Sequence, residues 1–269
     1  MQPSRQSTIS NLPNISHLCA PFHLLYNQFM EIHVAAAKTN KYATSESGDT
    51  LEMVERPNGG VSVVLADGQT SGRGAKNIST LVVRKVISLL AEGVRDGAAA
   101  RAASDHLFTE RSGKVTSTLN ILSADLQSGT IVITRNNPCP VFIARGDKVE
   151  CITSPSTSIG TSLNVRPSIT EFPLESGLTI VFYTDGIRFA GDRTGETFDI
   201  CTALEALLEE ENPTAQEMAD TILSHAIRLD NNRPNDDMSV VVLRSIPAET
   251  DQIRRMSFKL PVPPLMIPH

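Results

Sequence analysis

The chain has 269 residues, of which 40% are hydrophobic and 20% are charged, so we expect a soluble globular protein with one large domain. Its formal net charge is −6 and it has no run of basic residues, which argues against nucleic acid as the main partner. The four cysteines form no C-x-x-C pair, and no apolar stretch approaches the ~20 residues that a membrane span needs. A zinc knuckle, a disulfide scaffold and a membrane anchor are therefore not indicated, and we expect a cytoplasmic location.

Two tails are predicted, one on each side of a domain that spans residues 29–246. Residues 1–28 are rich in Ser, Asn, Pro and Gln, with an apolar patch that includes Leu24 and Leu25. Residues 247–269 are rich in proline and show no long periodicity, which indicates an extended tail. The apolar residues of this second tail are expected to dock on the protein: Met256, Phe258, Leu260 and Leu265.

Short β-branched apolar runs predict strands at 61–66, 116–125, 130–134, 141–144, 178–184 and 239–243. Turn signals at 128–129 and 136–138 separate the three runs between residues 115 and 144. This spacing favours an antiparallel meander over repeated parallel crossovers.

Helices are predicted in two pairs. Apolar residues recur at helical spacing over 75–90, and an alanine-rich segment follows over 97–109. A second pair precedes Asp236, and its later member begins with the capping-box pattern of Thr214 and Glu217. We therefore expect sheets in the middle of the domain and helix pairs outside.

Four aspartates stand on or beside the predicted strands. Asp67 and Asp185 end apolar runs as Asp-Gly pairs, Asp236 opens another run, and Asp49 lies upstream. A single Asp-Gly pair is more often a turn than a catalytic site, because Gly accepts positive φ and Asp caps its own backbone. Several such pairs are less easily dismissed, since strands of one sheet deliver their ends to a common edge.

Converging carboxylates without His or Cys partners suit hard divalent cations such as Mg²⁺ or Mn²⁺. Two such ions would balance four aspartates, lower the pKa of a shared water and hold a phosphate for in-line attack. The sequence thus predicts metal-dependent phosphoester chemistry, with Asp67 as the residue that bridges the two ions.

These motifs resemble those of the metal-dependent protein serine/threonine phosphatases of type 2C, the PPM superfamily, and in particular its bacterial branch typified by the stage II sporulation E phosphatase. The resemblance extends from Ile32 to Arg244. In family order, the motifs are SGD at 47–49, ADGQTSGRGA at 66–75, the segment from GKVTSTLN to RNNPCP at 113–140, FYTDGI at 182–187 and NDDMSVVVLR at 235–244.

The resemblance implies an α+β fold, a four-layer α-β-β-α sandwich with two mainly antiparallel central sheets. It also implies a site with two cations, Mn²⁺ or Mg²⁺, in which Asp67 and Asp185 are the catalytic carboxylates. The implied ligand set is Asp49 for one metal, Asp67 for both with help from the Gly68 carbonyl, and Asp185 and Asp236 for the second metal. Asp237 would support this set or serve as an alternate ligand.

The chain departs from the family pattern at several positions. Thr70 replaces the first glycine expected after Asp67, which would cost about 1–2 kcal/mol if that position needs positive φ. The turn RNNPCP lacks the histidine of the family's Asn-Ala-Gly-His segment, and Gln69 stands where eukaryotic relatives have histidine. Without an arginine next to Asp49, Arg73 is the candidate for phosphate binding.

The leading hypothesis is an enzyme in bacterial signalling that hydrolyses phosphoserine or phosphothreonine on a protein through a hydroxide bridging the two metals. The resemblance suggests a small signalling regulator as the substrate, without nucleic acid or membrane partners, and leaves a homodimer open. Two alternatives remain: a weakened phosphatase fold that acts as a binding or scaffold module, and a small-molecule phosphohydrolase.

Overall fold

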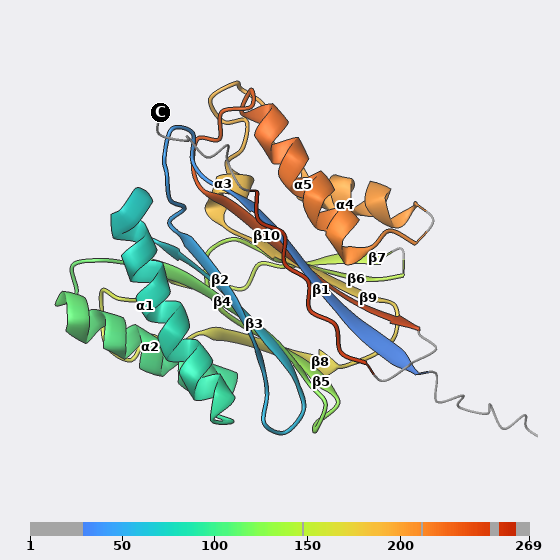
Figure 1. The fold of residues 1–269 in the computed structure, drawn as a ribbon, viewed down its shortest axis with the longest axis horizontal. Helices are drawn as coiled ribbons and strands as arrows, with labels where there is room; N and C mark the ends of the chain where they lie inside the picture. Colours follow the sequence, from blue (N-terminus) through green and yellow to red (C-terminus); the bar gives the residue numbers. More distant parts are fainter. Residues whose placement is uncertain (1–28, 147, 211, 248–252, 262–269) are drawn as a thin grey trace, which may run out of the picture.

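The computed structural model describes residues 29–146, 148–210, 212–247 and 253–261. In this part of the chain, two five-stranded antiparallel sheets face one another between helices, which makes a four-layer α-β-β-α sandwich (Figure 1). The predicted α+β fold is therefore confirmed. Side chains from both sheets form the central core, with Val63 and Leu122 on one sheet and Ile180 and Val241 on the other.

The first sheet has the order β1-β10-β9-β6-β7, and the second has the order β2-β3-β4-β5-β8. The strands of the first sheet are β1 (Met30–Thr39), β6 (Val141–Arg145), β7 (Lys148–Ile152), β9 (Leu178–Tyr183) and β10 (Met238–Pro247). The strands of the second are β2 (Asp49–Glu55), β3 (Gly60–Gly68), β4 (Ser117–Asp125), β5 (Thr130–Asn136) and β8 (Ser168–Pro173).

Each sheet carries a helix pair on its outer face (Figure 1). Helices α1 (Gly72–Ala91) and α2 (Asp96–Arg111) bury an apolar cluster with β3 and β4 of the second sheet. Helices α4 (Ile200–Leu208) and α5 (Ala215–Leu229) cover the first sheet, and the short α3 (Asp185–Arg188) follows β9. The capping box predicted at the start of α5 is present, with Thr214 and Glu217 bonded reciprocally.

The predicted meander over residues 115–144 is wrong in its last step. Strands β4 and β5 pair antiparallel as expected, but β6 leaves them and joins β9 and β7 in the other sheet. The signal at Asn136-Asn137-Pro138 therefore marks a crossing between sheets instead of a hairpin. A turn pattern fixes a change of direction, and it does not specify which neighbour the next strand finds.

The four strands missing from the sequence prediction are β1, β2, β7 and β8, and each is the edge strand of its sheet. Edge strands are half covered, so they mix polar and apolar residues. Strand β7, for example, reads KVECI and is largely exposed. Their sequences therefore lack the continuous β-branched runs that identify the central strands.

The tails are only partly described. Residues 253–261 form neither helix nor strand, and Met256 and Phe258 are 83% and 87% exposed, so the predicted docking of Met256, Phe258 and Leu260 is not seen there. Leu24, Leu25 and Leu265 lie outside the described residues. No helix in the described part of the chain has the length and apolar character needed to cross a bilayer.

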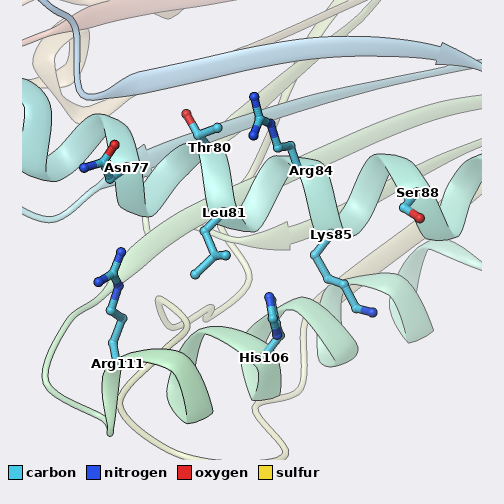
Figure 2. Close-up of a pocket in the computed structure, with 8 residues that line it drawn as sticks. All are labelled: Asn77, Thr80, Leu81, Arg84, Lys85, Ser88, His106 and Arg111. Atoms are coloured by element: carbon cyan, nitrogen blue, oxygen red, sulfur yellow. The ribbon is translucent and has the colours of Figure 1, made fainter.

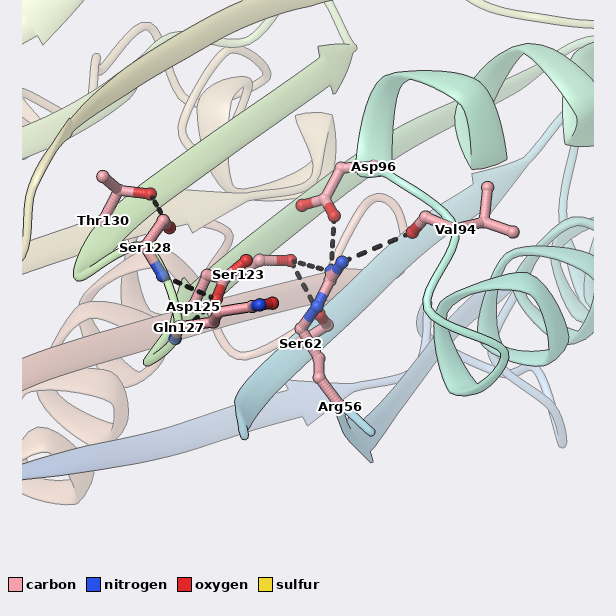
Figure 3. Close-up of polar contacts among 9 residues, drawn as sticks. All are labelled: Arg56, Ser62, Val94, Asp96, Ser123, Asp125, Gln127, Ser128 and Thr130. Atoms are coloured by element: carbon pink, nitrogen blue, oxygen red, sulfur yellow. Dashed lines mark hydrogen bonds and ion pairs between the residues drawn. The ribbon is translucent and has the colours of Figure 1, made fainter. Parts of the chain in front are cut away.

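A buried ion pair joins the turn after β2 to the first turn of α2 (Figure 3). Arg56 Nη1 lies 2.5 Å from Asp96 Oδ1, and the two side chains are only 9% and 4% exposed. The same guanidinium donates to Ser62 Oγ, Ser123 Oγ and the Val94 carbonyl. The pair holds the α1–α2 layer against the second sheet at the end of β2.

We predict that Arg56→Ala lowers the free energy of unfolding by about 3 kcal/mol, because it leaves the Asp96 carboxylate buried without its counter-charge. The matched control is Arg254→Ala, which breaks an exposed ion pair with Glu55 and should cost less than about 1 kcal/mol. Chemical denaturation of both variants measures the difference. Equal denaturation midpoints would show that the buried pair does not hold the layer.

Candidate functional site

Two of the predicted aspartates face each other at the end of one strand pair. Asp49 opens β2 and is the register partner of Asp67 near the end of β3. Asp49 is fully buried, and its Oδ2 accepts hydrogen bonds from Thr184 Oγ1 at 3.0 Å and Ser239 Oγ at 2.6 Å. Its Oδ1 has no hydrogen-bond partner among the described residues. Asp49 thus joins the two sheets through one oxygen and leaves the other uncommitted.

The other two aspartates come from the opposite sheet. Asp185 directly follows Thr184 after β9 and is the first residue of α3, while Asp236 lies two residues before β10. Strands β9 and β10 are neighbours, paired from Tyr183 and Val240 onward. The four aspartates therefore come from segments of both sheets and do not share the edge of a single sheet.

Burial and neighbouring charges shift the pKa values of three of these carboxyl groups. Burial raises the pKa of Asp67 to about 10, with further contributions from the charges of Asp49, Asp185 and Asp236. Burial likewise raises the pKa of Asp49 to about 6, against the lowering effect of its hydroxyl donors. Burial and the Asp236 charge raise the pKa of Asp185. Asp67 therefore lies close enough to the other three aspartates for their charges to raise its pKa.

The fifth acidic residue, Asp237, binds backbone instead of facing an open position. Its Oδ1 accepts from the Lys41 amide at 2.9 Å and its Oδ2 from the Gly48 amide at 2.8 Å. Two lysines, Lys38 and Lys76, donate to the backbone carbonyl of Asp49 at 3.0 and 2.9 Å. These contacts fix the segment that carries Asp49 and place positive charge beside it.

The glycines of both Asp-Gly pairs are required by close packing. A Cβ at Gly68 would lie 2.1 Å from the Ala75 carbonyl oxygen, and a Cβ at Gly186 would lie 2.1 Å from the Asp237 carbonyl oxygen. Backbone cannot yield to such contacts as a flexible side chain would. Each glycine therefore allows another part of the site's backbone to approach its aspartate.

The donor chemistry of the site fits a hard divalent cation. The four aspartates offer only oxygen atoms, and the buried Asp49 Oδ1 lacks a protein partner. Among the described residues, no three His, Cys, Asp or Glu side chains stand close enough together to hold an ion as they are placed. The carboxylates are thus neighbours that would need to adjust their side chains to enclose an ion.

Other charged and thiol side chains in the sequence motifs make contacts of their own. Arg73 is exposed on the first turn of α1, with its Nε 3.8 Å from Glu46 Oε2. Arg135 is buried and donates to the Cys139 and Ile152 carbonyls. Burial raises the pKa of the Cys139 thiol to about 12, with Asp185 nearby, so the thiol stays protonated at neutral pH.

Sequence reasoning missed the hydroxyl and lysine partners of Asp49, which are Thr184, Ser239, Lys38 and Lys76. A weak signal existed for two of them, because Thr184 adjoins Asp185 and Ser239 lies two residues after Asp237. The lysines gave no signal, since Lys38 is 11 positions from Asp49 and Lys76 is 27 positions away.

Comparison with known proteins finds one matching family model and similar proteins in two bacteria. The chain matches the family model of stage II sporulation protein E over residues 57–245. It is 26% identical over 225 residues to stage II sporulation protein E of Bacillus subtilis (strain 168), covering 79% of this chain and 27% of that protein. The corresponding protein of Priestia megaterium is 25% identical over 198 residues, covering 74% and 34%. The chain spans only about a quarter to a third of the length of these relatives.

Solved structures give the same fold. The PP2C phosphatase domain of SpoIIE from Bacillus subtilis, with a fragment of its regulatory domain, superposes with a TM-score of 0.68 at 25% identity, covering 80% of this chain and 63% of that one. The catalytic domain of the serine/threonine phosphatase PstP, in complex with two manganese ions, gives 0.63 at 18% identity, covering 81% and 100%. RsbX in complex with magnesium gives 0.62 at 14%, covering 80% and 95%, and these last two likenesses are of fold alone.

We predict that Thr70→Gly stabilises the protein by about 0.5–1 kcal/mol. Thr70 has a φ of +78°, so its branched side chain is strained, and relief of about 1–2 kcal/mol outweighs the greater backbone freedom of glycine in the unfolded chain. Ser71→Gly is the control, because Ser71 has a φ of −144° and makes no side-chain cap hydrogen bond. The unfolding midpoints of the two variants should shift in opposite directions, and a loss of stability in Thr70→Gly would refute the strain.

We also predict that the chelator-treated protein loses stability as the pH rises from about 4 towards 10. An acid whose pKa is about 10 when folded and near 4 when unfolded binds a proton on folding between these values, so stability must fall with rising pH. Thermal unfolding in EDTA measures the slope. Asp67→Asn should flatten it and Asp220→Asn, on exposed α5 surface, should not; an unchanged slope in Asp67→Asn would assign the effect to other groups.

Proposed function

The chain belongs to the stage II sporulation protein E family and has the PP2C phosphatase fold, and from this premise we propose that it hydrolyses phosphoserine or phosphothreonine on a protein with the help of two divalent cations, Mn²⁺ or Mg²⁺. One observation carries the proposal: four separate segments bring Asp49, Asp67, Asp185 and Asp236 close enough that the charges of the other three raise the pKa of Asp67. Such crowding is unfavourable unless protons or cations compensate it.

In this proposal, Asp49 would hold one cation, Asp67 with the Gly68 carbonyl would serve both, and Asp185 and Asp236 would hold the second. The bound cations would neutralise the carboxylates, activate a shared water and orient the phosphate. Because the pKa of Asp67 is raised to about 10 without cations, Asp67 would give up its proton to hold them. Thr184 and Ser239 keep Asp49 Oδ2 occupied, so its Oδ1 remains for the cation.

The proposal extends to a phosphorylated signalling regulator as the substrate and to residues 29–246 as the catalytic domain. It is supported by the SpoIIE structure, whose protein is described as a cell fate determinant.

We predict that Asp67→Asn and Asp185→Asn each reduce Mn²⁺- or Mg²⁺-dependent turnover of an aryl phosphate by at least about 100-fold while the fold stays intact. Each change removes one anionic ligand without changing the size of the side chain. Asp220→Asn is the control, since its carboxylate contacts only Gln216 on the surface of α5. Circular dichroism reports the fold, and a metal titration of the initial rate reports the activity.

The same titration distinguishes the competing functions. Metal binding without turnover in the unmodified protein would favour a binding or scaffold module. Turnover of small metabolite phosphates but not of phosphopeptides would favour a small-molecule phosphohydrolase. Full activity in folded Asp67→Asn protein would overturn the assignment of the bridging ligand.

A further inference from the structure

A groove of about 450 Å³ runs between α1 and α2 on the outer face of the second sheet (Figure 2). Residues of α1 that recur at helical spacing form one wall, from Asn77 through Leu81 and Lys85 to Ser88. His106 and Arg111 of α2 form the other wall, and their side chains point towards α1 in Figure 2. Leu81 also packs against the apolar cluster with which α1 covers the sheet, whereas Asn77, Lys85 and Ser88 do not belong to that cluster.

The groove is positively charged. Lys85 reaches from α1 towards α2, and Arg111 reaches back from the end of α2 (Figure 2). Arg84 lines the same stretch, although its guanidinium points to the other side of α1 in that view. No carboxylate lines the groove, and among the described residues none of its Lys or Arg side chains takes part in an ion pair. This concentration of positive charge contrasts with the chain's net charge of −6.

The groove continues towards the candidate active site. An adjoining hollow of about 390 Å³ shares Asn77 and Arg111 with it and adds Lys114, Gln69 and Thr70 to the lining. Gln69 and Thr70 follow Asp67 and Gly68 directly in the chain. One continuous surface therefore leads from the exposed face of α1 to the segment that directly follows β3, the strand of the proposed bridging aspartate.

The dimensions suit an extended peptide. From Asn77 to Ser88, α1 rises about 16 Å at 1.5 Å per residue, which equals about five residues of extended chain. The cationic groups are spread along this length instead of converging on one point, so they match a row of carboxylates better than a single phosphate ion.

We propose that this groove binds an acidic, extended segment of the phosphorylated protein substrate and so directs the phosphorylated residue to the aspartates. The assignment of this segment to a substrate rests on the proposed function. The binding of an acidic peptide in the groove is independent of that function. Lys85, Arg111 and Lys114 are then specificity-determining residues that contact the substrate away from the reacting phosphate.

The binding test uses the full chain and a fluorescein-labelled hexaglutamate peptide, without metal or phosphate. We expect fluorescence anisotropy to show binding that weakens with rising salt and that falls about tenfold in Lys85→Glu/Arg111→Glu. Arg101→Glu, on the same helix but outside the groove, is the matched control and should change binding less than twofold. An equal loss of binding in Arg101→Glu, or no binding of the peptide by the unmodified protein, overturns the proposal that the groove binds an acidic segment.

A fluorescein-labelled hexathymidylate tests whether the groove binds nucleic acid instead of an acidic protein segment. Tighter binding of hexathymidylate than of hexaglutamate, lost in Lys85→Glu/Arg111→Glu, would make the groove a nucleic-acid site and overturn the proposal. Weaker binding supports an acidic protein segment.

The kinetic test compares two phosphoserine peptides, one flanked by six glutamates and one by six serines, with an aryl phosphate as reference. Lys85→Glu/Arg111→Glu should raise KM about tenfold for the acidic peptide and leave turnover of the aryl phosphate unchanged, since the aspartates are intact. An equal effect on all three substrates would overturn the groove's role in specificity. Peptide binding without turnover of any substrate would instead contradict the proposed function and leave the groove standing.

Discussion

The mutual repulsion of carboxylates brought together at the ends of two sheets is the constraint on which the rest of this structure depends. Asp49 and Asp67 come from one sheet, and Asp185 and Asp236 come from segments next to the strands of the other. Holding them together requires glycine at positions 68 and 186, where backbone from another segment passes too close for any side chain. It also requires hydroxyl donors on Asp49 and two lysines at its backbone carbonyl. The fold supplies each of these from a different element.

The central strands and the two helix pairs could be predicted from the sequence, because buried segments have long apolar runs or apolar residues at helical spacing. Strand β9 is buried at every position and reads LTIVFY, while α5 begins with a reciprocal cap. The edge strands could not be predicted, since half-covered segments such as β7 and β8 carry polar and apolar residues in nearly equal measure. A local sequence pattern also could not predict that β6 crosses to the other sheet. This crossing depends on the pairing of β6 with β7 and β9, and β9 is distant in sequence.

In the candidate site, too, some residues could be predicted from the sequence and others could not. The four aspartates could be identified because each adjoins a strongly apolar run, and their proximity follows from the fold. Their supports could not, because Lys38 and Lys76 are ordinary surface-like residues in sequence and reach Asp49 only through the packing of β1 and α1. The strain at Thr70 lies between these cases: the missing glycine was visible in the sequence, and the positive φ became visible only in the structure.

Asp49 also links the two sheets through the hydrogen bonds that it accepts from two hydroxyl groups. Thr184 and Ser239 belong to segments of the first sheet and Asp49 belongs to the second, so this one carboxylate connects the two sheets at their buried end. Under the proposed function, a descendant that lost catalysis would be released from selection at Asp185 or Asp236, whereas Asp49 would still link the two sheets at that end. Among inactive homologues, Asp49 should therefore be the last of the four aspartates to drift.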